Sequence, residues 1–114
     1  MPKFEPKDPE FEAKVRESFG KQTAMQSLGA VISRVKPGEV EIEMPYRADF
    51  TQQHGFVHGG IVTAIVDSAC GYAALSLSAP ETAVLTVSIR SIFSLRPKGT
   101  GYWPVVKSFG QVQR

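Results

Sequence analysis

The sequence lacks several features that mark whole classes of proteins. Its single cysteine excludes an internal disulfide, and we interpret Cys70, which lies in an apolar segment, as a small core residue. Asp67 interrupts the longest apolar run, so no uncharged stretch reaches the about 18 residues that a membrane-spanning helix needs. Lysine and arginine are scattered and the net charge is only +2, which argues against nucleic acid as a partner. With no apolar secretory segment at the start, a soluble, cytoplasmic protein is expected.

Length and composition predict one domain. The chain has 114 residues, 42% of them hydrophobic, which is enough for one core and too short for two. We therefore expect a single domain over residues 1–114. Residues 1–8 contain two prolines and mixed charges, so they are expected to form a flexible lead.

The first half of the chain predicts two short helices and a hairpin. Apolar residues at four-residue spacing indicate a helix that begins near Asp8-Pro9 and ends at Gly20; they are Phe11, Val15 and Phe19. A second helical turn is expected over Thr23–Leu28. Residues 31–35 and 40–44 then alternate between apolar and polar side chains around a Pro-Gly turn, which predicts an antiparallel hairpin with one dry face.

The second half predicts a buried helix followed by strands. Residues 57–76 are apolar on nearly all sides, so a sheet is expected to wrap around this helix. A strand is expected over residues 83–89, with a bulge where Ile92 and Phe93 break the alternation. Residues 97–101 predict a loop, and residues 103–109 a last strand that Pro104 weakens. Together these elements indicate an α+β fold with one sheet curled around one helix.

Gly59 and Gly60 stand at the expected start of the long helix. A helix N-terminus carries unpaired N–H groups and partial positive charge, so two amides without side chains can approach an oxygen that becomes negative during acyl transfer. The alternative is that the pair only permits a tight turn into the helix.

Asp67 is the second candidate for chemistry, because a carboxylate among apolar helical residues is costly to bury. Eight residues separate it from Gly59, which is about 12 Å along a helix. One substrate carbon cannot meet both groups, so an active Asp67 requires the Gly59 of a second copy of the chain, and at least a dimer is expected. The alternative is that Asp67 forms a polar pair across a subunit interface.

Two histidines raise the question of a metal site. His54 and His58 stand four residues apart, but neighbouring glycines place them in a loop and no third ligand has a matching spacing. We therefore expect neither a metal ion nor another cofactor.

The segment Gly55-x-x-His58-Gly59-Gly60, followed by Asp67, Gly71 and Thr86-Val87, resembles the hotdog-fold acyl-CoA thioesterases of the phenylacetate-degradation (PaaI-like) type. The resemblance covers about residues 20–97. It implies an antiparallel β-sheet wrapped around a long central helix. It also implies a homodimer or homotetramer in which the sheets of two subunits continue into each other and the active sites form at their interface. The chain ends before the family's last one or two strands, so its C-terminal strands are expected to be incomplete.

The same resemblance implies roles for individual residues. The Gly59 amide would polarise the thioester carbonyl, with Gly60 beside it contacting substrate, and His58 would shape the turn. Asp67 would act as nucleophile or as general base. Two weaker assignments complete the set: Gln52, which would orient the water or the thioester, and Thr86, which would help to hold the attacking water. Their alternatives are a solvated loop side chain and an ordinary strand residue.

The function implied is hydrolysis of an acyl-CoA or aryl-CoA to a carboxylic acid and CoA. The rival hypotheses are a non-catalytic acyl-CoA-binding module and an inactive truncated thioesterase. The sequence does not place the site for the CoA nucleotide; Arg90, Arg96 and Lys98 are simply cations available to it. Phe56 and Tyr72 are interpreted as packing groups rather than substrate contacts.

Overall fold

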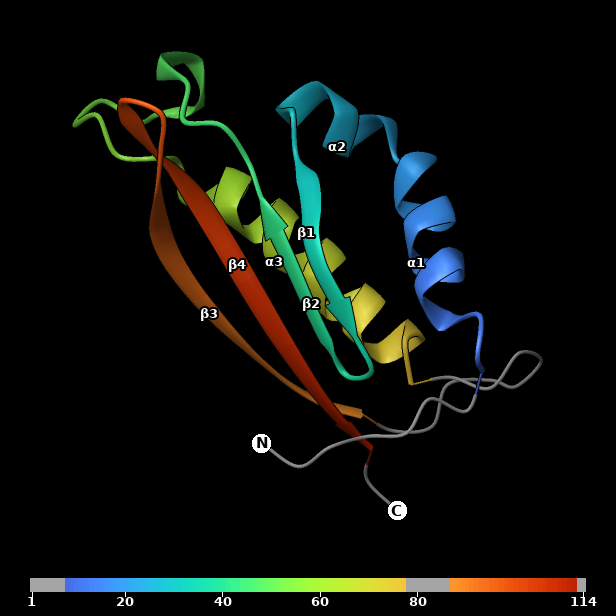
Figure 1. Ribbon diagram of the computed structural model, residues 1–114. Coiled ribbons are helices and arrows are strands. Elements are labelled where there is room, and N and C mark those ends of the chain that lie inside the picture. The colour runs from blue at the N-terminus through green and yellow to red at the C-terminus, as the bar shows by residue number, and fades with distance from the viewer. Residues whose placement is uncertain (1–7, 78–86, 113–114) are drawn as a thin grey trace.

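The computed structural model describes residues 8–77 and 87–112 and forms one sheet with one long helix across it (Figure 1). The elements in chain order are α1 (Phe11–Gly20), α2 (Thr23–Leu28), β1 (Val31–Lys36), β2 (Glu39–Glu43), the 3-10 helix η1 (Ala48–Phe50), α3 (Gly59–Leu75), β3 (Val87–Lys98) and β4 (Gly101–Val112). The four strands are antiparallel in the order β1-β2-β4-β3. This arrangement confirms the expected α+β fold.

The core lies between the sheet and α3. Helix α3 packs against β2, β4 and β3. Alternate residues of β2 and its continuation point into this layer and are fully buried; they are Val40, Ile42 and Met44. Cys70 of α3 is only half-buried, and its Sγ lies 3.2 Å from the Oγ of Ser91. None of the helices in the described part of the chain has the length and apolarity to cross a membrane.

The N-terminal helices form as the sequence predicts. Val15 is fully buried, and Phe11 and Phe19 pack around it from the same face of α1. Gly29 ends α2 with φ 70°, a backbone conformation that favours glycine.

Asp8, the last residue of the segment expected to be a flexible lead, is held in place. It is buried, its carboxylate accepts the Glu10 N–H at 2.9 Å, and it lies 3.1 Å from the Lys14 amine. Residues 1–7 lie outside the described residues.

Strand β1 departs from simple alternation. The pairing with β2 shifts register between Ile32 and Arg34, so the strand contains a bulge. Ile32 therefore packs on the core together with Val35, whereas Val31 is 43% exposed. A bulge of this kind depends on the partner strand and is not visible in the apolar pattern of β1 alone.

Strands β3 and β4 form a long, regular hairpin, and two expectations about it are wrong. The pairing with β4 is continuous from Val87 to Lys98 and has no bulge at Ile92 and Phe93. These two side chains therefore point to opposite faces of the sheet, and they are 49% and 48% exposed. Pro97 belongs to β3 rather than to a loop, which an edge strand tolerates because its outer N–H positions need no partner. Pro104 lies inside β4, and its carbonyl accepts the Met44 N–H at 3.0 Å.

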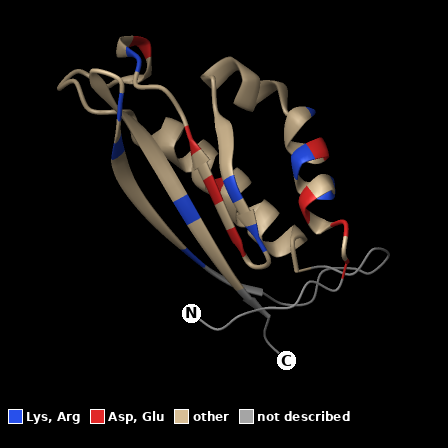
Figure 2. Ribbon diagram, viewed as in Figure 1, with Lys and Arg blue, Asp and Glu red and all other residues tan. Residues whose placement is uncertain are grey.

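The outer face of the sheet buries charge. The hairpin was expected to have one dry face, yet Glu41 and Glu43 on its other face are only 4% and 3% exposed. Arg96 of β3 reaches over β4 and donates to both carboxylates at 2.6 Å. Lys98 donates to Glu43 at 2.6 Å, and Figure 2 shows the acidic stretch of β2 beside basic residues of the neighbouring strands. These ion pairs tie the edge strand β3 to β2.

This cluster predicts a loss of stability in acid. Burial alone would raise the pKa of Glu41, but hydrogen bonds from Ser33 and Arg96 and the charges of Arg96 and Lys107 outweigh it and lower the pKa below its usual 4.5. A lowered pKa stabilises the fold above pH 4.5, and this contribution is lost as the pH falls below that value. Urea titrations between pH 7 and pH 3 measure this effect. At pH 7 the free energy of unfolding of Glu41→Gln is expected to be about 1 to 3 kcal/mol lower than that of wild type. The variant should also show a shallower decline in acid than wild type; an equally steep decline would contradict the prediction.

Candidate active site

The loop before α3 is held rigidly by its own hydrogen bonds. The Gln52 and His58 amides donate to the carbonyls of Phe56 and Phe50, both at 2.8 Å. Gly55 turns the chain with φ 85°, and the Tyr46 hydroxyl donates to its carbonyl at 2.7 Å. The start of α3 therefore has a fixed position relative to the sheet.

His58 is the N-cap of α3. Its Nδ1 accepts the Gly60 N–H at 2.9 Å, which satisfies one of the amides at the start of the helix. The expectation of two unpaired glycine amides is thus wrong for Gly60, whose N–H is engaged. His58 instead has the structural place expected for a residue that shapes this turn.

Gly59 supplies the remaining free amide. Within the described part of the chain its N–H donates no hydrogen bond, and it lies in the first turn of α3. A Cβ added at this position would meet no atom within 4 Å, so the space around the amide is open. A free N–H at a helix N-terminus is suited to bind an oxygen that carries negative charge.

Gln52 is partly committed to the loop. Its side-chain oxygen accepts the His54 N–H at 2.6 Å, which stabilises the turn that leads to Gly59. Its amide nitrogen has no partner among the described residues. The predicted contact with water or thioester therefore remains open to that nitrogen and to the second lone pair of the oxygen. Thr86 lies outside the described residues.

Asp67 is exposed, which contradicts the expectation of a buried carboxylate. The sheet and α1 together cover only one side of α3, as its buried positions show; they are Ile65, Ser68, Ala69, Tyr72 and Ala73. The opposite side carries an exposed stripe at four-residue spacing, namely Gly59, Thr63, Asp67 and Gly71. The free amide and the carboxylate thus lie on the same uncovered side of the helix.

Two cavities adjoin these groups. An apolar cleft of about 670 Å³ lies beside Gly59 and is walled by aromatic and aliphatic side chains, among them Tyr46, Phe56, Phe93 and Tyr102. A smaller, more polar pocket of about 360 Å³ lies beside Asp67. Phe56 is 71% exposed at the cleft, so its interpretation as a packing group is wrong, whereas Tyr72 is buried and packs edge-on against Phe19 at 6.0 Å.

The cleft contains residues that the sequence did not single out. Tyr46 and Tyr102 come from a loop and from the start of β4, and only the folded hairpin brings them next to Gly59. The polar pocket likewise includes Gln22, which nothing in the local sequence distinguishes from a solvated glutamine. Of the cations considered for a nucleotide, Arg96 and Lys98 are engaged by Glu41 and Glu43.

Comparison with known families agrees with this geometry. The thioesterase superfamily model matches residues 54–97, which contain the start of α3, Asp67 and most of β3. A curated protein of Saccharolobus solfataricus, named as a candidate esterase, is 33% identical over 51 residues. The match covers 45% of this chain and 36% of that protein, so the chain spans about a third of the length of this relative.

Solved structures extend the similarity over the whole fold. A thioesterase family protein from Silicibacter pomeroyi is 34% identical, with a TM-score of 0.62, and the alignment covers 90% of this chain and 99% of that one. The Escherichia coli PaaI protein of the phenylacetic acid degradation operon has a TM-score of 0.57 at 16% identity, over 88% and 92% of the two chains. At that identity the second likeness concerns the fold alone.

Proposed function

The chain belongs to the thioesterase superfamily and has its hotdog fold, and from this membership we propose that it hydrolyses an acyl-CoA thioester to a carboxylic acid and CoA. The observation that carries the proposal is the Gly59 amide at the N-terminus of α3, which no acceptor among the described residues engages, with an exposed carboxylate, Asp67, two turns further along the same helix.

The Gly59 amide fits the electrostatic demand of the reaction. Attack on a thioester carbonyl makes its oxygen negative, and one well-placed donor lowers the barrier by about 3 to 4 kcal/mol. The CoA thiolate is a good leaving group, so the main requirement is a stabilised oxyanion together with an activated nucleophile. Asp67 supplies the second part, either as general base towards water or as the nucleophile itself.

A complete site requires two copies of the chain. Thr63 lies midway between Gly59 and Asp67 on the exposed stripe of α3. Two antiparallel helices related by a two-fold axis near Thr63 would place Asp67 beside the partner subunit's Gly59, and would do so twice. The stripe has small side chains at Gly59, Thr63 and Gly71, so the helices can approach closely. Strand β3 is also at the sheet edge and exposes Ile92, Phe93 and Leu95, which favours covering by a second copy.

The test combines thiol release with solution mass. Wild type is expected to be a dimer or larger and to release CoA from at least one member of an acyl-CoA and aryl-CoA panel. Thr63→Arg places a bulky charge at the proposed axis, and is expected to halve the mass and lower kcat/KM at least about 100-fold, since each site loses its partner group. The matched control is Thr63→Ser. An active monomer would contradict the shared site, whereas binding of acyl-CoA without turnover would support a non-catalytic module.

A further inference from the structure

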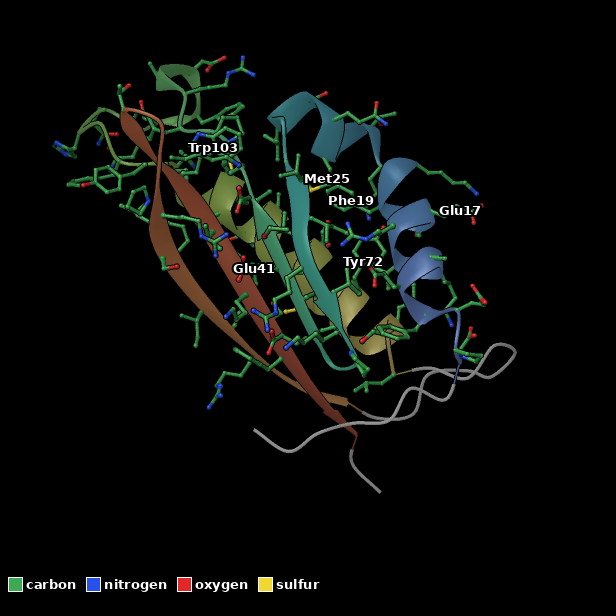
Figure 3. The ribbon with its side chains drawn as sticks, in the orientation of Figure 1. Glu17, Phe19, Met25, Glu41, Tyr72 and Trp103 are labelled. Atoms are coloured by element: carbon green, nitrogen blue, oxygen red, sulfur yellow. The ribbon has the colours of Figure 1, made fainter. Side chains whose placement is uncertain are left out.

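A hydrogen-bonded chain of side chains joins α1 and α2 to α3 next to Asp67. Ser68 donates to the side-chain oxygen of Gln22 at 2.9 Å, and the Gln22 amide nitrogen donates to the Tyr72 hydroxyl at 2.8 Å. That hydroxyl also lies 3.1 Å from the Ser18 hydroxyl. Tyr72 and Ser68 are only 5% and 7% exposed, and Figure 3 shows Tyr72 in the space between α3 and α1. The network therefore fixes the position of Gln22 against two successive turns of α3.

Gln22 retains hydrogen-bonding capacity at the polar pocket. A glutamine amide has two N–H donors and an oxygen with two lone pairs, and the network uses one donor and one lone pair. Gln22 is half-buried and borders the pocket together with Asp67, Ser18 and Leu75. A half-buried donor held in one place favours a ligand group that can accept its hydrogen bond.

The two cavities differ in the chemistry that they can accept. The cleft at Gly59 is lined by aromatic and aliphatic groups and is suited to a hydrocarbon. The pocket at Asp67 offers amide and hydroxyl groups and has about half that volume. A CoA thioester has the same asymmetry, because the acyl group lies on one side of the reacting carbon and the amide-bearing pantetheine arm lies on the other.

We propose that the pocket beside Asp67 binds the pantetheine amide nearest the sulfur, with the second N–H of the Gln22 side chain donating to the carbonyl of that amide. This inference rests on the proposed function, since it concerns the leaving-group side of the same site. The pantetheine amide is trans, so its C=O and N–H point in opposite directions and a single side chain engages only one of them. The acyl group then occupies the apolar cleft of the partner subunit, across the thioester carbon.

The experiment compares two thioesters of one acyl group. The N-acetylcysteamine thioester retains the amide nearest the sulfur, and the S-pentyl thioester replaces it with methylenes. Wild type is expected to favour the first in kcat/KM, and Gln22→Leu is expected to lower that preference about fivefold to tenfold. The effect is the change in preference on mutation, so the intrinsic reactivity of the two thiols cancels. A variant that loses part of its folded population lowers both rates equally and leaves the ratio unchanged.

The matched control is Gln26→Leu, an exposed glutamine of α2 whose side chain donates to the Gly20 carbonyl, outside the pocket. It should keep the wild-type preference. An unchanged ratio in Gln22→Leu would overturn the inference while leaving the proposed function standing. A change in the preference between a hydroxylated and a plain acyl group on the same thiol would also overturn it, because Gln22 would then contact the acyl side. If wild type releases CoA from an acyl-CoA but cleaves neither short thioester, the inference fails and the proposed function stands; if no acyl-CoA is cleaved, both fail.

Discussion

Replacement of Asp67 with asparagine is expected to lower kcat for thioester hydrolysis by about 10² to 10⁴-fold. Asparagine has nearly the same shape as aspartate but can neither take a proton from water nor attack a carbonyl. Asp67 is exposed and has no hydrogen-bond partner among the described residues, so the thermal midpoint should stay close to that of wild type. The measurement is thiol release under saturating substrate, with the folded fraction checked by circular dichroism.

Asp49→Asn is the appropriate control, because Asp49 is also an exposed aspartate but lies in η1 rather than on α3, where it pairs with Arg47 at 2.9 Å. It should retain wild-type turnover. If Asp67→Asn kept more than about a tenth of the activity, Asp67 would be neither base nor nucleophile.

Gly59→Pro should remove the free amide without disturbing the helix, and is expected to lower kcat by about 10² to 10³-fold. Gly59 is the first residue of α3, the position at which proline is best tolerated. The preceding residue, His58, has φ −61° and ψ 134°, an extended conformation that a following proline permits. Kinetics and thermal unfolding of the same preparation separate loss of the donor from loss of the fold.

Two comparisons make this result specific. Gly59→Ala adds a side chain but keeps the N–H, and its Cβ has open space in the chain, so it should lose far less activity than Gly59→Pro.

On the proposed pairing, Gly59→Pro and Asp67→Asn chains also complement each other. Random reassociation makes half of the dimers mixed, and each mixed dimer has one intact site, so about a quarter of wild-type activity should return. No recovery after verified subunit exchange would contradict a site shared between chains.

The sequence predicts most of the fold because its signals are local. Apolar spacing and glycine stops define α1, α2 and their ends, and the Gly-Gly pair after His58 marks the start of α3. The site motif is equally local, since His58, Gly59 and Gly60 form one turn whose geometry depends only on the helix N-terminus.

The features that sequence reasoning missed depend on distant partners. The burial of Glu43 requires Arg96, which is 53 residues away along the chain. The exposure of Asp67 follows from which side of α3 the sheet covers, and an apolar helix does not reveal that side. Phe56 was expected to pack, yet its loop points it at the cleft, because hydrogen bonds to Gln52 and Tyr46 fix the turn before it.

The ion pairs on the outer face of the sheet also constrain how a nucleotide could be recognised. Arg96 and Lys98 lie in direct contact with Glu41 and Glu43, so a phosphate approaching this surface would have to compete with carboxylates that the fold already holds in place. On the proposed function, the counter-charges for the adenosine end of a CoA are expected from cations outside this cluster. The sheet's basic residues secure an edge strand, and on the proposed function substrate selection falls to the short thioester segment of the CoA.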